Sequence, residues 1–75
     1  MNEKVLNFKG LQCPMPIIET NKAIKTVEIG ETFRVIVDDP AAKSDFEAWS
    51  KQTGQTIVEM SKKEGAVEIL LKREH

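Results

Sequence analysis

The feature of this sequence that most restricts its fold is a strand-like segment, ETFRVIVD (Glu31–Asp38), with a helix-like pattern on each side of it. The segment is rich in β-branched and aromatic residues, which are enriched in strands. Before it, apolar residues recur at helical spacing, which predicts a helix that begins at Cys13 or Pro14 and ends before Gly30. When two strands are joined by a helix, they are usually parallel neighbours in the sheet, and the connection between them is right-handed.

The second helical pattern follows the sequence DDPA. Asp39 is of a type preferred at the N-cap, and Pro40 suits the first helical position. We therefore expect a helix that runs from this point until Gly54. The residues of its apolar stripe, which we expect in the core, are Ala42, Phe46, Trp49 and Thr53.

Three further segments have strand-like patterns: KVLNF (Lys4–Phe8), QTIVEMS (55–61) and AVEILLK (66–72). The KKEG between the last two predicts a hairpin turn, and the polar tail KREH is expected to fray. The order β-α-β-α-β-β predicts an α/β (α+β) two-layer sandwich, with a mixed four-stranded sheet and two helices on one face. The strands carry apolar residues in both phases, so either a partner covers the open face or its aliphatic side chains are simply exposed.

Composition excludes several classes of protein. The 75 residues suit a single domain (1–75), and the 11 basic and 12 acidic residues argue against nonspecific binding to nucleic acid or membrane. A single cysteine rules out a disulfide framework and a Cys-x-x-Cys pair, and one cysteine with the terminal His75 is too few ligands for zinc. The sequence has no signal-peptide pattern and no apolar run long enough to span a bilayer, so we expect a cytoplasmic protein. We also expect it to be a monomer and to hold no metal.

The cysteine lies in KGLQCPMPIIE, directly before Pro-x-Pro. Pro14 and Pro16 are both tolerated in the first turn of a helix, and Gly10 allows the chain to turn before it. A helix N-terminus carries partial positive charge and free N–H groups, so we expect Cys13 to be exposed, oriented and lowered in pKa. The alternative is that Cys13 is a small buried apolar residue, as free cysteines often are.

The thiol has no second cysteine, metal site or histidine base within the predicted fold. It is therefore poorly suited to hydrolysis or disulfide exchange, and better suited to carrying a group covalently and passing it on.

Two segments of the chain resemble those of a known family. GLQCPMP matches the Gly-Leu-x-Cys-Pro-x-Pro signature of the TusA (SirA-like) sulfur-carrier family, and VDDPAAKSDFEAW is similar to that family's second signature. The resemblance extends from about Val5 to Lys72. It implies a fold like that of the C-terminal domain of bacterial translation initiation factor three.

The resemblance also implies a chemistry. In the family the cysteine, Cys13 here, accepts sulfane sulfur as a persulfide from a cysteine desulfurase or rhodanese. It then passes the sulfur to an acceptor protein, for tRNA thiolation, molybdenum-cofactor maturation or sulfur oxidation. This is a persulfide carrier with no further cofactor, rather than a stand-alone turnover enzyme. The acidic residues linked to partner contact correspond to Asp38, Asp39 and Asp45.

Two other functions stay open at this point. A regulatory or protein-interaction module of the same fold would keep the motif without carrying sulfur, because fold does not imply function. An RNA-binding domain is suggested only by the shared architecture, and the balanced charge argues against it.

Overall fold

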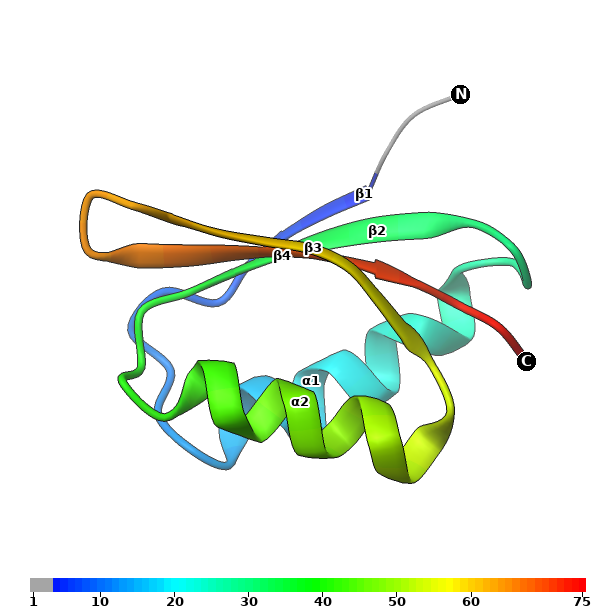
Figure 1. Ribbon diagram of the computed structural model, residues 1–75, viewed down its shortest axis with the longest axis horizontal. Coiled ribbons are helices and arrows are strands. Elements are labelled where there is room, and N and C mark those ends of the chain that lie inside the picture. The colour runs from blue at the N-terminus through cyan, green and yellow to red at the C-terminus, as the bar shows by residue number, and fades with distance from the viewer. Residues whose placement is uncertain (1–3) are drawn as a thin grey trace.

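The computed structural model describes residues 4–75. Its elements are β1 (Lys4–Asn7), α1 (Met15–Ala23), the 3-10 helix η1 (Ile24–Thr26), β2 (Thr32–Val37), α2 (Ala42–Thr53), β3 (Thr56–Lys63) and β4 (Ala66–Lys72). Both helices lie against one face of the sheet, and the other face is open (Figure 1). The predicted order and two-layer sandwich are confirmed; the first three residues of the predicted domain lie outside the described residues.

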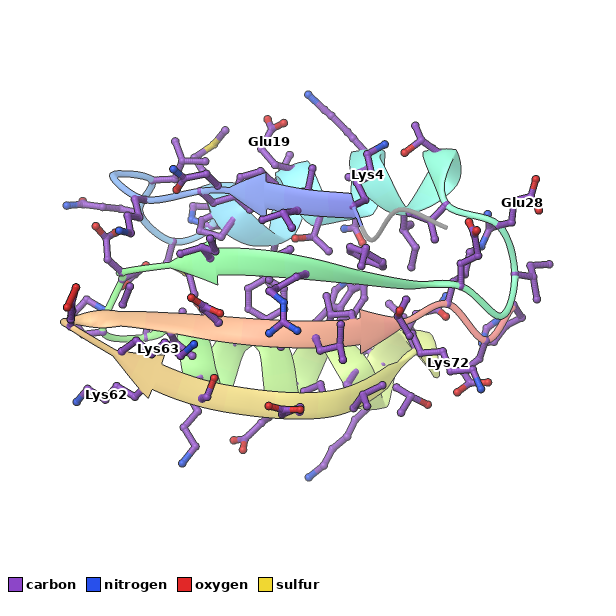
Figure 2. The ribbon with its side chains drawn as sticks, turned by 90° about the horizontal axis from the view of Figure 1, so that it is seen from above. Lys4, Glu19, Glu28, Lys62, Lys63 and Lys72 are labelled. Atoms are coloured by element: carbon purple, nitrogen blue, oxygen red, sulfur yellow. The ribbon has the colours of Figure 1, made fainter. Side chains whose placement is uncertain are left out.

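The four strands are arranged in the order β1-β2-β4-β3. β1 and β2 are parallel, and the other two pairs are antiparallel. This arrangement brings the loops that follow β1 and β2 to the same end of the sheet as the β3–β4 turn. Figure 2 shows Lys62 and Lys63 at this end, and Lys72 and Glu28 at the opposite end. The cysteine loop and the acidic segment before α2 therefore become neighbours.

The core forms where the sheet meets the helices. Along β2, alternate residues face the helices and are fully buried, as the period of two in a strand requires. Phe46 and Trp49 of α2 are 0% and 4% exposed and pack edge to face, with ring centroids 5.9 Å apart, so the predicted core stripe is confirmed at these positions. The Trp49 Nε1–H donates to Asn21 Oδ1 at 2.8 Å, which ties α2 to α1.

The open face of the sheet mixes apolar and charged side chains. Arg34 lies on this face and pairs with Glu68 at 3.6 Å, and Lys63 approaches the same carboxylate at 3.9 Å. Ile36 and Leu70 are half-buried among these strands. The second set of apolar strand residues thus lies on the open face beside charged side chains.

Helix α1 is shorter than expected: it begins at Met15 and ends at Ala23, rather than running from Cys13 or Pro14 to Gly30. The Thr26 hydroxyl donates to the Ala23 carbonyl, and this local bond competes with the helical pattern. The chain then tightens into η1 and becomes extended at Val27.

The tail does not fray at Arg73, contrary to expectation. Its guanidinium donates to the carbonyls of Ile24 and Val27, at 3.3 and 2.7 Å, and its backbone pairs with the loop before β2. The Ile24 carbonyl also accepts the Val27 N–H, so Arg73 gives it a second hydrogen bond and supplies the bond to the Val27 carbonyl at the end of the helical segment.

The hairpin turn is tighter than KKEG suggests. β3 continues to Lys63, which pairs with Ala66, so only Glu64 and Gly65 form the turn. Both have positive φ, +46° and +82°, as a two-residue primed turn requires.

Candidate functional site

The loop that carries the cysteine is held by the acidic segment that follows β2. Gly10, with φ of +88°, makes the turn out of β1, a conformation that glycine adopts without strain. Its N–H donates to Asp38 Oδ1 at 3.0 Å. Gly10 thus has a backbone conformation that suits the expected turn, and Asp38 accepts its N–H.

Asp39 links the cysteine to the start of α2. Its Oδ2 accepts a hydrogen bond from the Cys13 N–H at 2.6 Å, and its Oδ1 accepts one from the Ala41 N–H at 3.0 Å. The expectation that Asp39 is the N-cap is wrong. The Ala42 N–H donates to the Asp39 carbonyl, so Pro40 and Ala41 form a turn, and Ala41 is the N-cap.

The Cys13 thiol is exposed, which excludes the alternative of a buried apolar residue. The thiol forms a hydrogen bond with the Asp45 carboxylate in the first turn of α2, and this bond raises the pKa of the thiol above its ordinary value. Desolvation and the negative charges of Asp45 and Asp39 act in the same direction.

The expected lowering of the thiol pKa is therefore wrong. Cys13 lies before the N-cap, Pro14, and two residues before the first residue of α1. The partial charge of a helix end acts only within its first turn. The carboxylates of Asp45 and Asp39, in contrast, both raise the pKa of the thiol.

The two prolines fix the backbone on the helix side of the cysteine. Pro14 is the N-cap of α1, and Pro16 is its second residue, where the missing N–H leaves no intrahelical bond unmade. The peptide bond between Cys13 and Pro14 is cis. Pro16 is buried, whereas Met15 and Ile18 are each 39% exposed and lie close to the cysteine along the chain.

The structure thus brings all seven predicted site residues to one end of the sandwich. The sequence did not indicate that Asp38 and Asp39 hold the loop through backbone N–H groups, or that Asp45 bonds the thiol. Two adjacent aspartates at the end of a parallel strand were the available signal, because such an end faces the loop of its neighbour. Within residues 4–75, no group of acidic, histidine and cysteine side chains could hold a metal ion. Nor do these residues contain a helix long and apolar enough to cross a membrane.

Comparison with known proteins identifies the family to which the sequence belongs. The model of the family described as "Sulfurtransferase TusA" matches residues 4–73. The chain belongs to the TusA family. The resemblance drawn from the two motifs is confirmed, and the TusA-family match spans both the cysteine loop and the acidic segment.

Relatives extend this finding across most of the TusA domain. The sulfur carrier protein TusA of Allochromatium vinosum is 34% identical over 71 residues, 95% of this chain and 93% of the relative. YrkI of Bacillus subtilis is 45% identical over 60 residues, 80% of each chain. The crystal structure of a SirA-like protein from Desulfitobacterium hafniense superposes with a TM-score of 0.79. At 23% identity, covering 95% of this chain and 97% of that one, this last match supports the fold.

Proposed function

We propose that this protein is a sulfur carrier that accepts sulfane sulfur as a persulfide on Cys13 and passes it to an acceptor protein. The observation that carries the proposal is an exposed thiol on the family's cysteine position, fixed at its backbone by Asp39 while its sulfur stays accessible. Membership of a sulfur-carrier family supplies the chemistry that this geometry then has to perform.

Loading is a transfer between two thiols. The Cys13 thiolate attacks the outer sulfur of a donor protein's persulfide; a new S–S bond forms at Cys13, and the donor's S–S bond breaks. The donor cysteine leaves as a thiolate, so no net oxidation or reduction occurs. We propose that Asp45, whose carboxylate interacts with the resting thiol, receives its proton during loading.

Unloading repeats the same step in the other direction. A thiolate of the acceptor attacks the outer sulfur of the Cys13 persulfide, and Cys13 leaves as a thiolate. Both partners are proteins, which suits a thiol on a surface loop rather than in a closed cavity. A cysteine desulfurase or a rhodanese would serve as the donor, and no cofactor is needed beyond the sulfur itself.

The test is the intact mass of the reduced protein after incubation with a cysteine desulfurase and cysteine. A gain of one sulfur atom, reversed by reductant and absent from Cys13→Ser, is expected. A second arm replaces the desulfurase with inorganic polysulfide, which needs no protein contact. Loading only by polysulfide would mean that the donor is of another class. Loading by neither would reject the carrier and favour a regulatory or interaction module of the same fold.

A further inference from the structure

A groove runs along α2 and β3 and extends to Asp39, the residue that accepts the Cys13 N–H. Its first part has a volume of about 460 Å³ and an apolar floor formed by Ile57, Met60 and Val67. Its second part, about 470 Å³, is lined by Asp38, Asp39 and Pro40. The two parts adjoin each other, because both are lined by the same three residues: Lys43, Lys62 and Val67.

The strand along this groove has a free edge. β3 is the last strand in the order β1-β2-β4-β3 and pairs with β4 alone among residues 4–75. β3 lies at one edge of the sheet (Figure 2), and α2 packs against the helix-covered face of the sheet (Figure 1). A free strand edge offers main-chain donors and acceptors to an extended segment of another chain.

Only part of this edge is regular. A bulge between Ile57 and Glu59 interrupts the register, and from Glu59 to Lys63 each residue pairs in order with β4. Bulges protect edge strands against pairing, so the first half of β3 is poorly suited to receive another strand. The second half finishes at the same end of the sheet as the loop that carries Cys13.

Two lysines lie at the junction of the two parts of the groove, whereas the carboxylates of Glu47, Asp38 and Asp39 line its two ends. Both oxygens of Asp39 already accept backbone N–H groups, as does one oxygen of Asp38. Lys43 and Lys62 form no ion pair with residues 4–75. Lys62 is paired with Val67 on β4, and the Val67 side chain packs against the core. Because paired residues of neighbouring strands point to the same face, the Lys62 side chain lies on the helix side of the sheet, where the groove is.

We propose that this groove binds an extended segment of the protein that exchanges sulfur with Cys13, added to the edge of β3 as a further strand. The segment pairs with the regular part of β3, Glu59–Lys63, and carries apolar residues at positions i and i+2. The second packs on Met60, and the first extends past the bulge and contacts Ile57 through its side chain only. The segment also carries a carboxylate at i+4, on the same face, which pairs with Lys43 and Lys62. The exchanging cysteine follows the carboxylate and reaches the Asp39 end of the groove, where the Cys13 N–H is held. The proposal rests on the proposed function for the identity of the partner, but its binding step does not.

Two peptides test the binding step directly. Acetyl-VTVTDTC-amide has the required pattern, and acetyl-VTVTKTC-amide differs only in its charge; each is also made in reversed order, since the strand could add in either direction. Titration of the 15N-labelled protein should shift amide resonances of Glu59–Lys63 and Lys43. Neutralising both lysines (Lys43→Gln with Lys62→Gln) should weaken the acidic peptide about fivefold, as the loss of two exposed ion pairs predicts. The matched variant, Lys51→Gln with Lys72→Gln, should not.

Absence of shifts with either order, shifts confined to the open face around Arg34, or equal affinity for the two peptides would overturn the proposal. A transfer arm separates this outcome from failure of the carrier function. Cys13 is first loaded with polysulfide; the peptide thiolate then attacks the outer sulfur, Cys13 leaves as a thiolate, and the peptide gains one sulfur in its mass. Binding at β3 without any loading of Cys13 would reject the carrier and keep the groove. Loading without binding at β3 would reject the groove alone.

Discussion

Replacing Asp39 with alanine tests whether the acidic segment holds the cysteine loop in place. The carboxylate accepts one N–H from Cys13 at 2.6 Å and one from Ala41 at 3.0 Å, and it therefore joins the loop after β1 to the start of α2. Alanine removes both acceptors and leaves two backbone N–H groups without their partner. We expect a loss of stability and a loosening of the loop.

The size of the loss follows from these two bonds. Hydrogen bonds to a charged partner contribute about 1.5–3 kcal/mol each, and solvent competes for the exposed bond at Cys13, so the lower end of this range applies. We expect Asp39→Ala to lower the free energy of unfolding by about 3 kcal/mol. A domain of 75 residues has roughly 4–11 kcal/mol in total, so the variant retains a folded population.

Urea denaturation followed by tryptophan fluorescence measures this loss, and hydrogen exchange at the Cys13 amide locates it. Asp38→Ala, which removes a single exposed bond to Gly10, should cost about half as much. Glu47→Ala removes a carboxylate of α2 that forms no ion pair with residues 4–75, and should change stability by less than about 0.5 kcal/mol. An Asp39→Ala value no larger than that of Glu47→Ala, with unchanged exchange at Cys13, would refute the reasoning.

Three other changes have clear expected outcomes. Asp45→Asn removes a negative charge beside Cys13 and should lower the pKa of the thiol, so the rise of the alkylation rate with pH moves to lower pH; an unchanged profile would contradict the hydrogen bond as its cause. Glu64→Asn places a residue tolerant of positive φ in the hairpin turn and should raise the Tm by about 2–8 °C in calorimetry, whereas a lower Tm would count against the turn geometry. Arg73→Ala removes the hydrogen bonds to the carbonyls of Ile24 and Val27 and should lower the free energy of unfolding by about 1–3 kcal/mol in urea denaturation, where Lys72→Ala is the control.

Most of the fold could be predicted because its local and global signals agree. The strand at 32–37, the apolar stripe of α2 and the hairpin all have the periods that their burial requires. The errors occur at the ends of helices and strands, where hydrogen bonds from side chains determine where each element stops. The α1 helix stops early because of Thr26, and the tail is ordered by Arg73, whose partners lie 46 and 49 residues earlier in the sequence. A local sequence pattern cannot predict a contact between residues so far apart in the chain.

The residues of the candidate site could be named from the sequence, and the structure brings them together, but their electrostatics could not be predicted. Cys13, its prolines and the aspartates are identifiable because they stand in two recognisable motifs. The sign of the pKa shift could not be predicted, since it depends on whether the sulfur is nearer to the helix end or to Asp45. That distance is set by the two-residue turn before each helix, and sequence patterns locate helix starts only to within about two residues.

The same carboxylates that position Cys13 also oppose its ionisation, and this conflict bears on how a carrier works. Asp39 fixes the backbone of the loop, but its charge acts with the hydrogen bond and charge of Asp45 to raise the pKa of the thiol. A thiolate at this position is therefore disfavoured relative to a free cysteine. A partner that brings positive charge to the sulfur, or that moves Asp45 away from it, would lower the pKa of the thiol, so we expect sulfur transfer to be faster inside such a complex than to a small thiol in solution.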